Sequence, residues 1–299
     1  MSDTISRKSF LKWLAMLPAG ALFMNLRNFE QEMQQAGNSP KMPVLFLGHG
    51  SPMNAIEENI FVKGFREAAQ ALPIPQVILC ISAHWYTKGT MVTAMEKPPT
   101  IHDFGGFPKA LFDVQYPAPG DPAFAREIQE IYQPELQVSL DQHWGLDHGA
   151  WSVIKHLYPK AEIPVVQMSI DYTRSAAWHY ETAHSLQRLR HKGVLIIGSG
   201  NIIHNLGLVD FQRIQEIGYG YDWAQEAHQL VNLHLRNGND KALVEYQQLG
   251  KAMQLAVPSP DHYLPLIYTL ALRDAQDELS IFNDSLLAGS LSMTSIKLA

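Results

Sequence analysis

The alternation of short apolar runs with helical patterns is the feature that most constrains the fold of this chain. Runs rich in Val, Ile and Leu predict strands at 43–47, 76–83, 91–95, 163–170 and 193–198, and an edge strand at 290–297. Apolar residues at helical spacing predict helices at 55–72, 121–132, 176–190, 221–236, 240–249 and 263–273. Asp121 followed by Pro122, Asp240 and Asp261 are expected to begin the helices at 121–132, 240–249 and 263–273. Such alternation predicts the α/β class, with a three-layer α/β/α fold around a central sheet that is largely parallel or mixed.

The composition is that of a globular protein. Apolar residues make up 46% of the chain and charged residues 17%, so the chain can bury a full core. The net charge of −6 is mild and no Lys/Arg-rich run is present, which argues against a nucleic-acid partner. The single cysteine, Cys80, lies in an apolar run and excludes both an intramolecular disulfide and a thiolate zinc cluster. We expect Cys80 to be a buried core thiol.

Residues 1–40 are expected to lie outside the fold, which leaves 41–299 as a single catalytic domain. Basic residues in Ser6–Lys12 precede an apolar stretch, Trp13–Leu26, that is too short for a comfortable membrane span. The basic part resembles a twin-arginine export signal in which Lys8 replaces the second arginine. The alternative is an amphipathic surface helix. The periplasm and the cytoplasm are therefore both open as locations.

Four histidines occupy positions where such a fold would gather them. His49, His84 and His204 follow apolar strand-like runs, and His262 precedes an apolar helix pattern. Ligands of open α/β sheets collect at the carboxyl ends of the strands. Imidazole is the commonest metal ligand. These histidines therefore predict a mononuclear metal site.

Glycines accompany the candidate histidines and leave the imidazoles uncrowded. His148, in Leu146–Trp151, also has a glycine beside it and aromatic residues nearby, so it is a candidate acid/base or substrate-contacting residue. Each histidine has a structural alternative, such as a turn residue bonded to the backbone. The turn Gly198–Gly200 is not a nucleophile elbow, because Ile197 replaces the first glycine of G-x-S-x-G.

Six ordered motifs resemble the 4,5-DOPA extradiol dioxygenase family, a branch of the class III extradiol ring-opening dioxygenases. The resemblance covers essentially all of residues 41–299 and does not extend to the amino-terminal segment. The motifs are Leu47–Met53, Ser82–Trp85, Thr100–Pro108, Leu146–Trp151, Gly198–Leu206 and Pro258–Leu266.

The resemblance implies one divalent metal ion per chain, Fe(II) for dioxygenase activity, although Zn(II) is often found in purified members. It implies His49 and His84 as metal ligands and His262 as the third. An all-histidine set departs from the usual two-His-one-carboxylate triad. Whether His204 is a fourth ligand or the general base is therefore open, and zinc is a competitor because it accepts nitrogen ligands.

The implied chemistry assigns roles to further residues. We expect His204 to take a proton from the catechol and His148 to donate one during ring opening. The loop from Phe104 to Phe107 is a candidate cover for the substrate. The predicted aromatic walls of the substrate pocket are Trp85, Tyr86 and Trp151, although each could equally be ordinary core.

The sequence therefore predicts an extradiol dioxygenase that cleaves a DOPA-like catechol with O2. Its partners are a small aromatic diol and O2, with no nucleic acid and no stable membrane span; the oligomeric state does not follow from the sequence. The first alternative is a zinc hydrolase that uses the same histidines, and another is a metal- or ligand-binding protein without turnover. Arg126, Arg174 and Lys109 are candidates for a substrate carboxylate, with solvated surface charges as the alternative.

Overall fold

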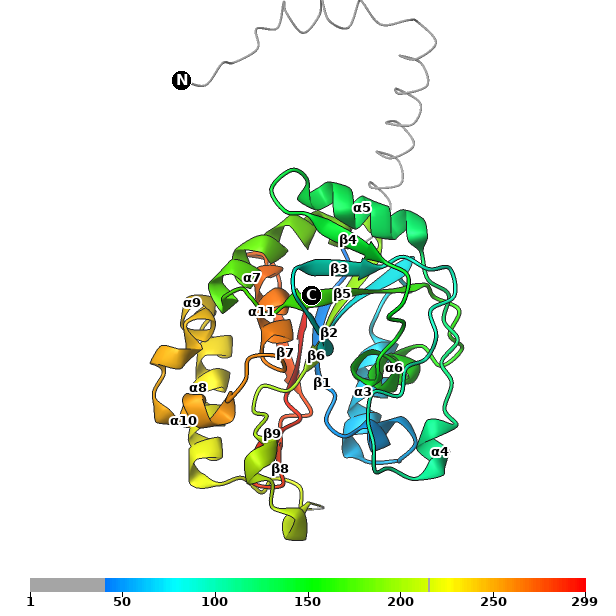
Figure 1. The fold of residues 1–299 in the computed structure, drawn as a ribbon. Coiled ribbons are helices and arrows are strands. Elements are labelled where there is room, and N and C mark those ends of the chain that lie inside the picture. Colours follow the sequence, from blue (N-terminus) through cyan, green and yellow to red (C-terminus); the bar gives the residue numbers. More distant parts are fainter. Residues whose placement is uncertain (1–40, 215) are drawn as a thin grey trace, which may run out of the picture. The chain divides into compact units, whose positions relative to one another are not determined.

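An eight-stranded sheet organises residues 41–214 and 216–299, the part of the chain that the computed structural model describes (Figure 1). A separate pair, β8 (Leu286–Leu287) and β9 (Leu291–Ser292), forms a two-stranded sheet. The strands of the large sheet are β1 (Val44–Gly48), β2 (Val77–Thr87), β3 (Thr90–Thr93), β4 (Val138–Asp141), β5 (Val165–Asp171), β6 (Val194–Gly200), β7 (Leu279–Phe282) and β10 (Ser295–Leu298). Their order across the sheet is β4-β3-β5-β2-β6-β1-β10-β7.

The centre of the sheet is parallel and both edges contain antiparallel pairs. Strands β5, β2, β6 and β1 pair in parallel, whereas β10 is antiparallel to β1 and β3 is antiparallel to β5. In the central register Gly48 lies opposite Gly200 and Ser82 opposite Ser199, so the carboxyl ends of β1, β2 and β6 meet. The predicted mixed sheet is confirmed.

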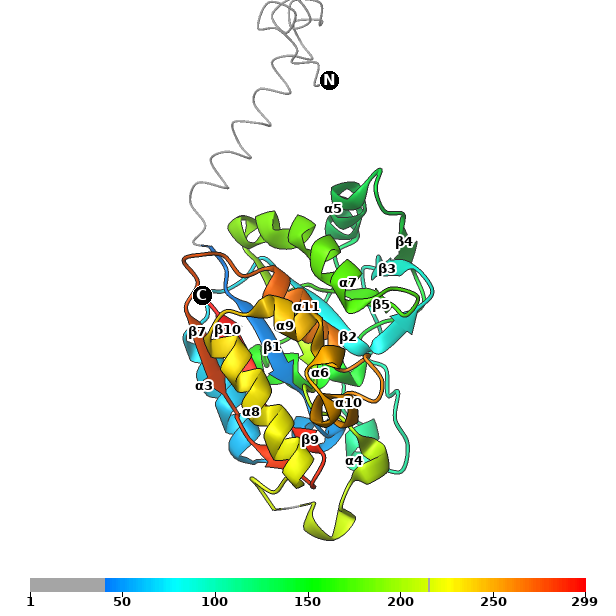
Figure 2. The same ribbon diagram turned by 90° about the vertical axis from the view of Figure 1, so that its left-hand side faces the viewer.

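Helices cover both faces of the sheet, as Figures 1 and 2 show. One face carries α3 (Ile60–Gln70), α4 (Lys109–Phe112) and α6 (His148–Leu157). The other face carries α5 (Pro122–Tyr132), α7 (Ala176–Ala183), α8 (Asp222–Arg236), α9 (Asp240–Val244), α10 (Lys251–Ala256) and α11 (Leu264–Ala271). Alternate residues of one strand serve the two cores: Leu45 packs with the α3 and α6 side, and Phe46 with the α11 side. The three-layer prediction is therefore confirmed.

Several local predictions need correction. The predicted edge strand at 290–297 is divided between β9 and β10, and β10 is an inner strand because β7 pairs along its outer side. Helix α9 is capped by Asn239 and not by Asp240, since the Asn239 side chain accepts the amide of Ala242. The predicted helix at 176–190 ends as α7 at Ala183 and continues as the 3-10 helix η2 (His184–Lys192). Helix α6, in which nine of the ten residues are buried, was not predicted.

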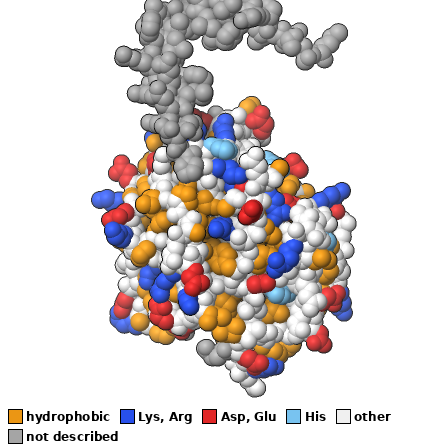
Figure 3. All heavy atoms as spheres, turned by 180° about the vertical axis from the view of Figure 1, so that it is seen from behind, with side chains coloured by type: hydrophobic (Ala, Val, Ile, Leu, Met, Phe, Trp, Pro, Cys, Tyr) orange, Lys and Arg blue, Asp and Glu red, His pale blue; other side chains and the backbone are white. Residues whose placement is uncertain are grey.

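Other features agree with the sequence. Cys80 is a buried free thiol, as predicted. On the face drawn in Figure 3, acidic and basic side chains are interspersed rather than gathered by sign. Within the described residues no helix has both the length and the apolar character needed to cross a membrane. The predicted export-signal-like segment, 1–40, lies outside the described residues.

Candidate metal centre

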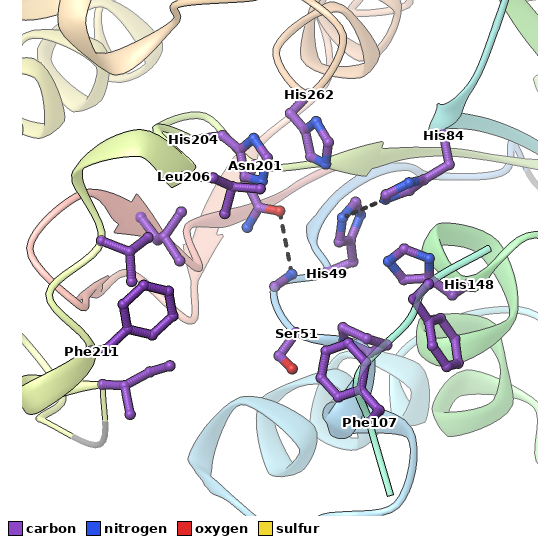
Figure 4. A pocket seen from close by; sticks show the side chains of 16 residues that line it. His49, Ser51, His84, Phe107, His148, Asn201, His204, Leu206, Phe211 and His262 are labelled. Carbon is purple, nitrogen blue, oxygen red and sulfur yellow. Dashed lines mark hydrogen bonds between the residues drawn. The ribbon is translucent and has the colours of Figure 1, made fainter. Parts of the chain in front are cut away.

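Five histidines from separate elements meet at the carboxyl end of the parallel strands (Figure 4). His49 follows β1, His84 lies in β2, His148 begins α6, His204 follows β6, and His262 precedes α11. The ring centroids of His84 lie 5.0 Å from those of His49 and His262, and 3.9 Å from that of His148. His204 stacks on His262, with 3.5 Å between the centroids and 10° between the planes. The structure thus brings together all five candidate histidines.

His49 and His84 present ring nitrogens to each other, with Nε2 atoms 3.2 Å apart. The Ser199 hydroxyl donates to the Gly149 carbonyl at 2.5 Å, so it has no second proton to offer. It therefore accepts from His49 Nδ1, which lies 3.0 Å away. This bond fixes the tautomer of His49 and leaves its Nε2 as a free lone pair that faces His84. Such an arrangement suits a metal ligand oriented by a hydrogen bond behind it.

Asp103 is shared between two of the imidazoles. Its Oδ2 lies 3.3 Å from His84 Nδ1 and 3.0 Å from His148 Nδ1, and its Oδ1 accepts the His148 backbone amide at 2.8 Å. Burial acts to raise the pKa of Asp103, but bonding to His148 outweighs it and the pKa falls below the usual value. Asp103 is a functional candidate that the sequence analysis missed. The available signal was its place beside His102 in the motif Thr100–Pro108.

His262 has a carboxylate of its own. Its Nδ1 lies 2.9 Å from Asp261 Oδ2, which leaves Nε2 for another partner. Burial acts to raise the pKa of Asp261, yet the bond to His262 holds that pKa below its ordinary value. Asp261 was predicted to begin the helix that is now α11, but α11 begins at Leu264 without a side-chain cap. Asp261 orients His262 instead.

The cluster favours neutral imidazole. Burial lowers the pKa of His49 well below its usual range, and the neighbouring histidines lower it further. The same causes lower the pKa of His84 to about 2. Burial, aided by His262, lowers the pKa of His204 to about 3. Neutral imidazoles with converging lone pairs are the form that binds a divalent metal ion, so this donor set fits one.

Two triads within the cluster can be considered as the ligands. One nitrogen from each of His49, His84 and His148 lies within 4.8 Å of the others. The triad implied by the resemblance contains His262 in place of His148, and the His262 ring centroid lies 5.2 Å from that of His49. Both sets share His49 and His84. The cluster can therefore hold a metal through histidines. The metal content of variants at His148 and His262 distinguishes the two sets.

A glycine allows His84 to sit against α6. A Cβ atom added at Gly149 would lie 2.5 Å from Ser82 Oγ and 2.8 Å from His84 Cδ2. The Ser82 hydroxyl, the His84 ring or the start of α6 would then have to shift. The glycine beside His148 is therefore required by the packing of a neighbouring ligand candidate.

A pocket of about 390 Å³ opens over the histidines. Its aromatic walls are Phe104, Phe107 and Phe211. The remaining lining residues are the five histidines with Gly50, Ser51, Pro52, Asn201, Leu206, Val209, Ile214 and Leu291. Phe104 and Phe107 belong to the loop that was expected to cover the substrate.

The structure does not bring the predicted aromatic walls Trp85, Tyr86 and Trp151 to this pocket. Trp85 is buried and stacks on Trp144 with 5.8 Å between the ring centroids, because successive strand residues point to opposite faces and His84 takes the pocket side. Trp151 is buried in the core, where its indole donates to the Ile101 carbonyl. Tyr86 packs edge-on against Tyr172.

Comparison with known proteins agrees with this geometry. Residues 40–281 match the family described as the catalytic LigB subunit of aromatic ring-opening dioxygenase. The chain is 45% identical to a 4,5-DOPA dioxygenase extradiol of Escherichia coli (strain K12) over 265 residues, which cover 87% of this chain and 96% of the relative. It is 33% identical to a protein of the same name from Beta vulgaris over 259 residues, 84% of this chain and 94% of the relative.

A solved structure is also similar. An uncharacterized protein from Escherichia coli K12 matches with a TM-score of 0.74 and 39% identity, over 86% of this chain and all of that one. The family match spans most of the chain, and the extradiol resemblance read from the six motifs is confirmed. The chain belongs to the family of the catalytic LigB subunit of aromatic ring-opening dioxygenase and is an extradiol dioxygenase.

Proposed function

We propose that this enzyme opens the ring of a catechol beside its two hydroxyl groups, with DOPA-type compounds as the first substrates to test. The observation that carries the proposal is the pair of Nε2 atoms of His49 and His84, 3.2 Å apart at the floor of an aromatic-walled pocket. The names of the relatives support the choice of substrate. Both atoms of O2 enter the ring-opened product, so the reaction needs no external reductant.

We propose His49, His84 and His262 as the ligands of one divalent ion, Fe(II) in the active enzyme. Their support is the set of groups that face each Nδ1 and leave each Nε2 available. Ser199 is hydrogen-bonded to His49, Asp261 is hydrogen-bonded to His262, and the Asp103 carboxylate lies 3.3 Å from His84 Nδ1. When bound, Fe(II) supplies Lewis acidity toward the catechol oxygens and a redox couple between ring and O2, which Zn(II) lacks.

His204 and His148 are proposed to move protons. His204 lines the pocket and stacks on His262, and its imidazole is proposed to accept a proton from the catechol. A positioned base of this kind contributes about 10²–10⁴-fold to the rate. His148 lines the opposite part of the pocket, with Asp103 behind its Nδ1, and is proposed as the proton donor during ring opening. The zinc-hydrolase alternative is not favoured, because the relatives are named as ring-opening dioxygenases.

The ligand assignment is tested by metal content. We expect His49→Ala, His84→Ala and His262→Ala to lose bound metal after dialysis, because each removes a ligand. His204→Ala and His148→Ala should retain metal and lose at least about 100-fold in turnover. The exposed His191 provides the control, and His191→Ala should change neither value. Loss of metal from His148→Ala with retention in His262→Ala would replace this ligand set by the alternative triad.

A further inference from the structure

The pocket has apolar residues along one side of its opening. Leu206, Val209, Phe211 and Ile214 come from one segment, 206–214, which contains the 3-10 helices η3 (Leu206–Leu208) and η4 (Phe211–Arg213). In Figure 4, Leu206 and Phe211 lie across the opening from His84 and His148. Phe211 is 75% exposed and Leu206 63% exposed, although both are apolar. We name this segment the apolar wall.

The pocket offers no charge to a substrate. Among the described residues that line it, none is Lys, Arg, Asp or Glu. Arg213 lies within the apolar wall, but its guanidinium pairs with Glu216 and stacks 3.3 Å from the Tyr219 ring centroid. A carboxylate or an ammonium group on the substrate would therefore lack a charged partner among these lining residues, whose polar members besides the histidines are Ser51 and Asn201.

The cations suggested from the sequence for a substrate carboxylate are not at the pocket. Lys109 pairs with Asp113 over both carboxylate oxygens, and the Arg174 guanidinium lies over the Trp178 ring at 5.2 Å. Neither these two residues nor Arg126 lines the pocket. Of the carboxylates described above, Asp103 lies between His84 and His148, and Asp261 is bonded to His262.

We infer that the site selects catechols whose ring substituent is uncharged and apolar, and that the apolar wall is the specificity-determining surface. This inference rests on the proposed function and narrows it. An apolar chain against Leu206 and Phe211 gains from leaving water, whereas a charged group there gains no ion pair from the lining residues. A DOPA-type substrate is then recognised by its diol and ring, and its amino-acid head group adds nothing to binding.

The test compares two catechols of equal chain length on the Fe(II)-loaded enzyme. We expect kcat/KM for 4-propylcatechol to exceed that for dihydrocaffeate, which carries a carboxylate at the end of its chain, by about tenfold or more. Equal values, or a preference for dihydrocaffeate, would overturn the inference and leave the dioxygenase assignment intact. Turnover of neither compound, with the metal site filled, would overturn the proposed function and the inference with it.

Variants connect the preference to the apolar wall. Phe211→Arg adds a cation at the pocket, and we expect it to reduce the ratio between the two substrates by about tenfold. Leu208→Arg is the matched control, because Leu208 is exposed in the same segment but does not line the pocket. It should leave the ratio unchanged. Equal effects of both variants would show a general charge effect and contradict the role of the wall.

Discussion

At the residue scale, the site depends on the groups behind the histidines as much as on the histidines. Ser199 sets the tautomer of His49 through its bond to the Gly149 carbonyl. Asp103 lies within 3.3 Å of ring nitrogens of both His84 and His148. A single carboxylate therefore orients a proposed ligand and the proposed proton donor. Partners of this kind tune metal ligands and are costly to remove.

Asp103→Asn tests this role. The amide keeps the size of the side chain but loses the negative charge, so we expect metal affinity to fall about 10- to 100-fold, with little change in thermal midpoint. Competition with a chelator of known affinity gives the measurement. Asp113→Asn is the matched control, since Asp113 is an exposed aspartate paired with Lys109 in the neighbouring segment. An unchanged metal affinity in Asp103→Asn would exclude the orienting role.

The sequence predicted the histidines but not their partners. Four histidines stood out because each follows or precedes a recognisable apolar run. Asp103 lies in a long loop with no periodic pattern, and its position depends on contacts with α6 that are distant in sequence. The same reason explains Phe211, which lines the pocket from an irregular segment.

At the element scale, α6 begins with His148, and its start is fixed by the residue before it. The N-cap Asp147 is fully buried and accepts from the Ala150 amide, the Ser82 hydroxyl and the Gln167 side-chain amide. Ser82 belongs to β2, two residues before His84. This cap therefore connects the start of α6 to two central strands, β2 and β5. Helix α5 has a simpler cap in Asp121, which accepts only the Ala123 and Phe124 amides.

The two caps make a matched pair of variants. Asp121→Ala removes a conventional cap, and we expect a loss of about 1 kcal/mol in the free energy of unfolding without effect on turnover. Asp147→Ala also leaves the buried Ser82 hydroxyl and the Gln167 side-chain NH2 group without their acceptor, so the loss should reach about 3 kcal/mol or more, with reduced turnover. Chemical denaturation and oxygen uptake measure the two effects. Equal losses in the two variants would contradict the connecting role of Asp147.

Elements with a strong period were predictable, and those defined by tertiary contacts were not. Asp121 followed by Pro122 marked the start of α5 correctly. By contrast β7 is short and half-buried, so the sequence shows no pattern for its pairing with β10 and predicts an edge strand there. Nine of the ten residues of helix α6 are buried, and this helix was not predicted from the sequence.

At the scale of the whole molecule, one buried ion pair connects distant parts of the chain. Arg190, at the end of η2, is fully buried and forms a two-point bond with Asp277, which also accepts from Lys41. Burial acts to raise the pKa of Asp277, but Arg190 and Lys41 lower it to about 2. The network joins the beginning of β1 to the segment before β7.

This pair predicts a pH dependence. Because the folded-state pKa of Asp277 is below its unfolded value of 3.8, its contribution is present above that value and is lost as pH falls through about 2. The shift corresponds to about 2 kcal/mol. Asp277→Asn, which leaves Arg190 buried and unpaired, should cost about 3–5 kcal/mol at pH 7. The difference in the free energy of unfolding between this variant and the unmodified protein should become smaller toward pH 2.

Denaturation midpoints across this pH range measure the effect. Asp274→Asn is the control, because that side chain is 28% exposed and its ion pair should contribute about 1 kcal/mol or less. A pH-independent difference in the free energy of unfolding between Asp277→Asn and the unmodified protein would show that the charge of Asp277 does not provide the stabilisation.

The layered architecture of the whole molecule was predictable from the sequence, since buried parallel strands have continuous apolar runs.

The central claim is that the histidine cluster supports ring opening by dioxygen, and stoichiometry tests it most directly. Protein stripped of metal and reloaded anaerobically with Fe(II) is mixed with L-DOPA and with 4-propylcatechol, while oxygen, peroxide and product absorbance are followed. We expect one O2 consumed per catechol, a yellow ring-opened product, no peroxide, and no uptake by His49→Ala. A filled metal site with no oxygen uptake, or uptake released as peroxide, would contradict the assignment.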